Sequence, residues 1–242
     1  PFALSLHPAV CIVKHTTPCG LAVGASVESA FRRALRTDPV SAFGSVISVN
    51  REVNESAASA IQELFVECLV APGFSEAALA ILMQKKNIRI LTFPSGEGAP
   101  PTLPVSTDDI EVFDAAVGHD ANAMRAARFL AAHGLDPDPL VLRGIYGGLL
   151  AQSPPLPPFF GIADPAWKVV TQREPMAGEA ADLAFAWSAI YGVKSNAILL
   201  AKDGATLGIG AGQMSRVDSS RLAVQKAADH GLDLDGCSLA SD

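Results

Sequence analysis

The chain has 242 residues, of which 49% are apolar and 18% charged, a composition typical of a globular protein with one large or two modest domains. Its net charge of −7 argues against nucleic acid or an anionic membrane as a partner, although a local basic pocket for phosphate would be compatible with it. The apolar runs are too short to span a bilayer, and no basic leader precedes an apolar signal core. We therefore expect a cytoplasmic protein with neither nucleic acid nor membrane as a partner.

Residues 8–93 alternate short apolar runs with helical patterns, and Ser26, Asn54 and Ser75 stand where N-caps are expected. The predicted strands are AVCIV (9–13), GSVISV (44–49), CLVAP (68–72) and IRILTF (88–93). The predicted helices are SVESAFRRALRTD (26–38, ended by Asp38-Pro39), NESAASAIQELF (54–65) and SEAALAILMQKK (75–86). This β-α-β-α-β-α-β order favours a three-layer α/β lobe.

A second alternating block follows a connecting segment that is rich in Pro, Gly and small polar residues (94–108). Its first predicted elements are a helix (121–134), the strand GGLLAQ (147–152), a proline-rich loop (153–161) and the strand WKVVT (167–171). A helix (179–192), a hairpin (195–210) that turns at Asp203-Gly204, and a last helix (219–231) are predicted next. The final residues, SLASD, are predicted to form no further element. We therefore predict a first lobe over residues 1–94, a linker over 95–140 and a second lobe over 141–242.

The stretch IVKHTTPCG (12–20) places a lysine and a histidine side by side at the end of an apolar run. Neighbouring side chains of a regular strand point to opposite faces, so Lys14 and His15 can share one pocket only if the chain bends there. Pro18 and Gly20, which follow at once, break a strand ladder and turn the chain. We expect a strand that ends at Val13 and delivers both titratable groups into a loop.

The glycine-rich run GIGAGQMSR (208–216) contains the first half of GxGxxG, but the third glycine stands at 212 instead of 213 and the run follows a hairpin. These departures argue against a dinucleotide site. The run favours a strand end that a ligand approaches closely, with Arg216 beyond it to bind a carboxylate or phosphate. A tight turn with a surface arginine is the alternative.

Two further stretches hold candidate site residues for which a purely structural role is the alternative. Lys194 and Asn196 lie two apart at a helix-to-strand junction, hence on one face if extended, where a cap or a turn would account for them equally. Phe43 and Gly44 form a bend before a strand, where the ring could stack on a flat ligand and the Gly44 amide could contact it. A place in the core is the alternative for Phe43.

Cysteine and histidine spacing was compared with the zinc deaminases, because two α/β lobes with scattered Cys and His would suit them. That chemistry needs H-x-E followed by P-C-x-x-C. Pro18-Cys19 begins such a motif, but position 22 is Ala22 and none of the five histidines begins H-x-E, so we expect no zinc. A Cys19–His15 nucleophile is conceivable, but no third group is identifiable, which favours packed, reduced thiols at all four cysteines.

Six segments in order resemble the transformylase part of the bifunctional family that combines phosphoribosylaminoimidazolecarboxamide (AICAR) formyltransferase with IMP cyclohydrolase. They cover most of residues 8–242 and leave 95–140 as a variable insertion. The segments are IVKHTTPCGLAVG, AFRRALRTDPVSAFGSVISVNREV, FVECLVAPGFSEAALAILMQKKNIRIL, GGLLAQ, FAWSAIYGVKSNAILLA and LGIGAGQMSRVDSSRLA. The resemblance implies two cytidine-deaminase-like three-layer α/β/α lobes with mixed sheets and no zinc. It also implies a homodimer whose active sites span the interface.

The resemblance also implies the reaction and the roles of the candidate residues. A formyl group passes from 10-formyltetrahydrofolate, the co-substrate, to the 5-amine of AICAR. His15 is implied as the acceptor of the amine proton and Lys14 as the cation that steadies the intermediate, while Asn196 orients the formyl group. Phe43, Gly44, Glu67, Lys194 and Arg216 are implied as substrate-binding residues.

The family pattern includes parts that this sequence lacks: a cyclohydrolase domain and an arginine-containing segment before the first strand, and, after Asp242, an aromatic-rich stretch followed by the closing elements of the second lobe. We therefore expect a truncated transformylase with an incomplete second lobe. Three functions remain open at this point: formyl transfer, an inactive remnant that at most binds purine nucleotide, and a deaminase of the related fold.

Overall fold

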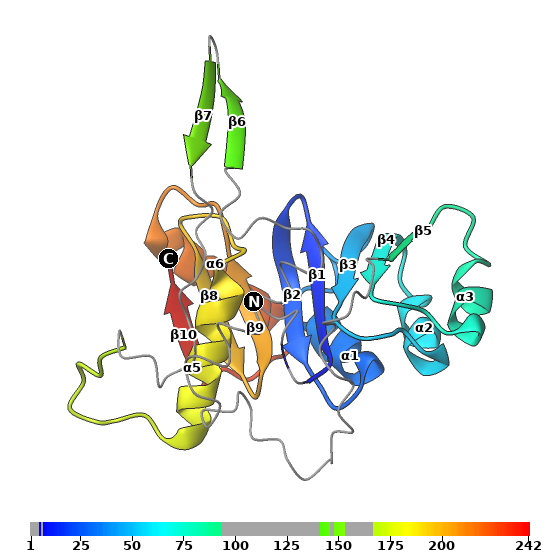
Figure 1. The fold of residues 1–242 in the computed structure, drawn as a ribbon. Helices are drawn as coiled ribbons and strands as arrows, with labels where there is room; N and C mark the ends of the chain where they lie inside the picture. The colour runs from blue at the N-terminus through cyan, green and yellow to red at the C-terminus, as the bar shows by residue number, and fades with distance from the viewer. Residues whose placement is uncertain (1–4, 6, 93–140, 146–147, 153–166) are drawn as a thin grey trace.

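The computed structural model describes residue 5 and residues 7–92, 141–145, 148–152 and 167–242 (Figure 1). The predictions for residues 94–140 and for the proline-rich loop lie outside these ranges. The strands are β1 (Ala9–Lys14), β2 (Thr17–Val23), β3 (Ser45–Val49), β4 (Val66–Ala71), β5 (Arg89–Thr92), β6 (Val141–Ile145), β7 (Gly148–Gln152), β8 (Ile198–Lys202), β9 (Ala205–Gly210) and β10 (Ser238–Ser241). The helices are α1 (Val27–Thr37), α2 (Glu55–Ile61), α3 (Glu76–Leu82), α5 (Ala177–Ile190) and α6 (Arg216–Asp229).

Eight strands form one mixed sheet in the order β10-β8-β9-β2-β1-β3-β4-β5. The pairs β3–β4 and β4–β5 are parallel, and the other neighbours are antiparallel. The remaining strands, β6 and β7, pair with each other and project from the body of the molecule (Figure 1). The mixed α/β class is therefore confirmed, and the cytidine-deaminase likeness stays a prediction.

Helices pack on both faces of the sheet. Val10, Ile12 and Ala22 lie in one buried cluster with α1 and α2, whereas Ala9, Leu21 and Val23, which alternate with them along β1 and β2, lie in a second cluster with α5. Alternation along a strand sends successive side chains to opposite faces, so α5 covers the face opposite α1. The sheet as a whole therefore forms three layers with its helices, and three layers within each predicted lobe stay a prediction. None of the helices in the described part of the chain is long and apolar enough to cross a membrane.

The two predicted lobes meet at the pairing of β2 with β9. Ala22 is registered with Ala205, and the N–H of Val23 donates to the Gly204 carbonyl at 2.9 Å. The N–H of Leu21 donates to the Thr206 hydroxyl, also at 2.9 Å. Strands from both predicted lobes therefore share one sheet, and the division at 95–140 stays a prediction.

Local signals in the sequence proved accurate at helix starts and at the second hairpin. The side chains of Ser26, Asn54 and Ser75 each accept the backbone N–H three residues on, as N-caps do. Asp203 and Gly204 connect β8 to β9 with φ of 52° and 67°, the positive values that a two-residue turn of this kind requires. These caps and this turn are confirmed.

Three expectations about strands were wrong. Residues 17–23 form β2 in spite of Pro18 and Gly20. Ile12 pairs with Gly20 and Val13 with Pro18, so the register shifts by one residue in a bulge, and the strand continues past the proline. Residues 238–241 form β10, although no element was expected there. Residues 167–171 form no strand; Val170 is 84% exposed, so its apolar side chain has no sheet to pack on.

Gly208 and Gly210, the two glycines of β9, face a helix, and the approach of a ligand to the run 208–216 stays a prediction. A Cβ atom on Gly208 would lie 2.1 Å from the Ala223 carbonyl oxygen, and one on Gly210 would lie 1.9 Å from that of Ser219. Both carbonyls belong to α6. The glycines therefore admit a helix against the strand, which is why α6 lies so close to β9.

Candidate active site

The β1–β2 turn carries the histidine. The strand runs through Lys14, one residue beyond the predicted end at Val13, and a two-residue turn of His15 and Thr16 reverses the chain. Their φ values are 51° and 62°, a region in which a β-branched residue such as Thr16 is strained. Strain of this kind gathers at functional sites, so the turn merits a functional hypothesis.

Lys14 joins this turn to the bend before β3. Its ammonium donates hydrogen bonds to the carbonyl oxygens of Phe43 at 2.8 Å and of Gly44 at 2.9 Å. Gly44 has a φ of 67°, and a Cβ atom there would lie 3.1 Å from the lysine Nζ. Gly44 is therefore needed both for its backbone conformation and for the approach of the lysine. The structure brings three predicted site residues together here.

The loop after α5 lies against the same turn. The ammonium of Lys194 donates to the His15 carbonyl oxygen at 3.2 Å. A Cβ atom on Gly192 would lie 3.1 Å from the Pro18 ring. The Lys194 carbonyl in turn accepts the N–H of Gly212 at 2.7 Å, which links this loop to the end of β9. Lys194 therefore joins the second half of the chain to the His15 turn.

Asn196 lies between the end of β9 and the start of α6. Its side-chain amide donates to the carbonyl oxygens of Gln213 at 2.9 Å and Met214 at 3.2 Å, while the main-chain carbonyl of Asn196 accepts the Ser219 hydroxyl at 2.7 Å. The side-chain amide N–H groups of Asn196 thus hold its side chain in place, which leaves the side-chain oxygen as the acceptor of this group.

Arg216 opens α6 and contacts the last residue of the chain. Its guanidinium donates to the Asp242 main-chain oxygen at 2.9 Å and reaches a carboxylate oxygen of Asp242 at 3.4 Å. Hydrogen bonds from the Ser195 side chain and from the Ala197 N–H, followed by that from Arg216, lower the pKa of Asp242. Asp242 was not among the predicted site residues, and its terminal position gave no signal for it.

Glu67, the remaining predicted site residue, takes part in none of the contacts given above. It is the extra residue of a bulge in β4, it is exposed, and its carboxylate lies 3.9 Å from the Arg89 guanidinium on β5. An exposed pair at this separation contributes little to stability. The role of Glu67 in binding stays a prediction.

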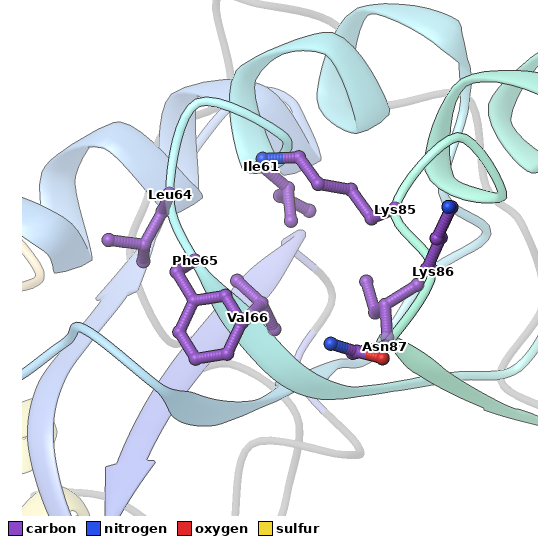
Figure 2. A pocket seen from close by; sticks show the side chains of 8 residues that line it. Ile61, Leu64, Phe65, Val66, Lys85, Lys86 and Asn87 are labelled. Atoms are coloured by element: carbon purple, nitrogen blue, oxygen red, sulfur yellow. The ribbon is translucent and has the colours of Figure 1, made fainter.

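A hollow of about 120 Å³ is lined in part by Phe65 (Figure 2), a residue that also contacts the Gly44 bend. Phe65 connects the two: its carbonyl accepts the Gly44 N–H at 2.8 Å and its ring lies 5.1 Å from that of Phe43. Lys85 and Lys86, from the loop between α3 and β5, line the hollow together with apolar side chains. Neither lysine was among the predicted site residues, although two adjacent lysines just before a predicted strand were a usable signal for local positive charge.

Cys19 does not suit the role of nucleophile. Its thiol is buried and contacts the Ile12 carbonyl at 3.5 Å, and burial, followed by the charge of Asp38, raises its pKa to about 11. Burial, followed by the proximity of Cys19, raises the pKa of Cys11 to about 12. The thiolate is the reactive form, so both groups are inert near neutral pH.

The two thiols should therefore resist alkylation in the folded protein. With iodoacetamide at pH 7.5, we expect Cys11 and Cys19 to be labelled at least about tenfold more slowly than in denaturant, since a raised pKa opposes attack at both and burial opposes it further at Cys19. Mass spectrometry of tryptic peptides measures each site, and Cys68 and Cys237, which are partly exposed, serve as internal controls. Rapid labelling of Cys19 in the native protein would contradict its buried placement.

Within the described residues, no three or more His, Cys, Asp and Glu side chains come together as a metal site. The expectation of a zinc-free protein stays a prediction.

The comparison with protein families agrees with this arrangement. The model of the AICARFT/IMPCHase bienzyme family matches residues 2–111 and 119–226, which include every predicted site residue and most of the segment predicted as an insertion. That description covers two activities of purine biosynthesis and does not separate them. Since the match spans well over half of the chain, the chain belongs to the AICARFT/IMPCHase bienzyme family.

Proposed function

We propose that the chain provides the formyl-transfer site of this family and moves a formyl group from 10-formyltetrahydrofolate to the 5-amine of AICAR. The observation that carries the proposal is the contact between the Lys194 ammonium and the His15 carbonyl, at 3.2 Å. It holds the loop that leads to Asn196 against the turn that carries His15. Groups for proton transfer, for charge stabilisation and for orienting a substrate therefore lie at one end of the sheet.

The chemistry needs one base and one source of positive charge. The amine nitrogen attacks the formyl carbon and forms a C–N bond, the carbonyl oxygen gathers negative charge, and the amine loses a proton. His15 accepts that proton and returns it to N10 of the folate as the C–N10 bond breaks, which releases tetrahydrofolate and the formylated product. The ammonium of Lys14 stabilises the oxyanion.

The bonds of Lys14 are compatible with that role. An ammonium has three donors, and carbonyl oxygens of Phe43 and Gly44 accept from this one. These acceptors fix the lysine in one place before substrate arrives, as electrostatic catalysis requires. A further donor is then available to the developing oxyanion.

The nucleotide part of AICAR carries a phosphate, and the lysine-lined hollow suits it. Lys85 and Lys86 supply positive charge, and Phe65, which lines the same hollow and contacts the Phe43 ring, offers flat apolar surface to the base. Lysine binds phosphate as a point charge. A net charge of −7 is compatible with a local basic pocket for phosphate, and this hollow is a candidate for that pocket.

The proposal is tested by assay of the purified chain with AICAR and 10-formyltetrahydrofolate, followed by the absorbance of the tetrahydrofolate product. We expect turnover that requires both substrates. Cytidine, the substrate of a deaminase, should stay unchanged when its own absorbance is followed, since deamination releases no tetrahydrofolate. A chain that binds AICAR in calorimetry without turning it over would support the inactive remnant instead. Cyclisation of the formylated product without formyl transfer would assign the other activity of the family.

We also propose that the active form is a homodimer in the cytoplasm. The β6–β7 hairpin projects from the body, Leu150 on it is 49% exposed, and an isolated two-stranded hairpin is marginally stable in water. A second copy would give this hairpin a surface to pack on. In the same assay, activity should elute with the dimer on gel filtration, and activity confined to the monomer fraction would overturn this part of the proposal.

A further inference from the structure

One buried ion pair in the structure has no part in the chemistry above. Lys226 on α6 donates a hydrogen bond to the carboxylate of Asp38, which follows the last residue of α1. The Asp38 side chain is 6% exposed and that of Lys226 is 34% exposed. Burial alone would raise the pKa of Asp38, but hydrogen bonds from Lys226 and from Ser41 outweigh it and hold that pKa below its ordinary value. The carboxylate is therefore charged at neutral pH.

Asp38 organises the loop that leads to the candidate site. Its second carboxylate oxygen accepts the Ser41 N–H at 2.9 Å, and its main-chain oxygen accepts the Ala42 N–H at 3.1 Å. The next two residues are Phe43 and Gly44, whose carbonyl oxygens hold Lys14. The position of Lys14 therefore depends on the conformation that Asp38 imposes on residues 39–44.

Lys226 lies on the helix that holds the other half of the site. Arg216 opens α6, and Ser219 one turn later donates to the Asn196 carbonyl. Lys226 follows Arg216 by ten residues, or about 15 Å along the helix. One rigid element thus contacts both the Asn196 side of the site and, through the ion pair, the loop behind Lys14.

We propose that Asp38 and Lys226 are positioning residues that set the separation of Lys14 from Asn196 and Arg216, an inference that rests on the proposed function. Buried ion pairs seldom add stability over apolar residues of the same size, because desolvation offsets the attraction. What such a pair supplies is one defined geometry. The neighbouring hydrogen bond of Thr37 to the Thr206 carbonyl, at 2.7 Å, anchors the end of α1 itself, so the ion pair acts on the loop beyond it.

The test uses Lys226→Met, which removes the cation, and Asp38→Asn/Lys226→Met, which leaves no buried charge and so keeps the fold if the single variant is unstable. We expect both to lower kcat about tenfold or more, with a smaller change in the KM for AICAR, because misplacement of Lys14 acts on the reacting geometry. Lys226→Arg, which keeps the pair, should retain most of the activity. Arg221→Met, an exposed change on the same helix, should have no effect.

Hydrogen exchange provides a readout that does not depend on activity. In the double variant, the amides of Ala42 and Gly44 should exchange about tenfold faster, while those in the middle of α6 should not change. Wild-type exchange at these two amides in a folded variant, with unaltered kcat, would overturn the inference. If the wild-type chain lacks formyl transfer, the proposed function fails, and the exchange experiment still decides whether the pair fixes this loop.

Discussion

Replacing His15 with asparagine should lower kcat for formyl transfer about 10²-fold or more, since loss of a positioned general base has that size of effect. Asparagine is the informative replacement because His15 has a φ of 51°, a conformation that Asn adopts more readily than most residues. The turn therefore stays intact while the group that accepts the proton is lost. Stopped assays at saturating AICAR and folate measure the change.

His15→Ala separates the two contributions of this residue. It should lose the same factor in kcat and also lower the melting temperature, because alanine disfavours the left-handed conformation. Added imidazole should restore part of the rate in this variant, as an external base can enter the vacated space. His230→Asn, at the end of α6 and away from the site, is the matched control. Full activity in His15→Asn would exclude His15 as the base.

The sequence predicted most elements because the signals for them are local. Ser26, Asn54 and Ser75 cap their helices through bonds that span three residues, and Asp203-Gly204 turns the chain within two. Strand β2 was missed because Pro18 was interpreted by its usual effect on a ladder. The bulge that accommodates it depends on the pairing with β1, which no short window of sequence contains.

The site was predicted in part for the same reason. Lys14 and His15 drew attention as neighbours in sequence, but the carbonyl oxygens that hold Lys14 come from residues 29 and 30 positions away. Asp38 was interpreted only as the end of a helix, because its partner Lys226 is 188 residues distant. Contacts at that range are set by the sheet order, in which β9 lies beside β2.

Gly210→Ala should destabilise the protein by about 3 kcal/mol, the upper part of the range for overpacking a core. The added Cβ would lie 1.9 Å from the Ser219 carbonyl oxygen and 2.6 Å from its carbon, both backbone atoms of α6, so the helix itself must move. For a chain of this size the melting temperature should fall by roughly 6–12 °C. Circular dichroism at 222 nm measures it.

The control for this change is Gly178→Ala in the first turn of α5, where an added Cβ meets nothing within 4 Å. There we expect no loss and at most a small gain in stability, since alanine is the better helix former. The comparison also decides between the two roles considered for the glycines of β9. If they received a ligand, Gly210→Ala would weaken AICAR binding and leave the melting temperature of the free protein unchanged. Because they receive α6, the melting temperature falls without any ligand, and activity falls with it as Arg216 and the Ser219 bond to Asn196 are displaced.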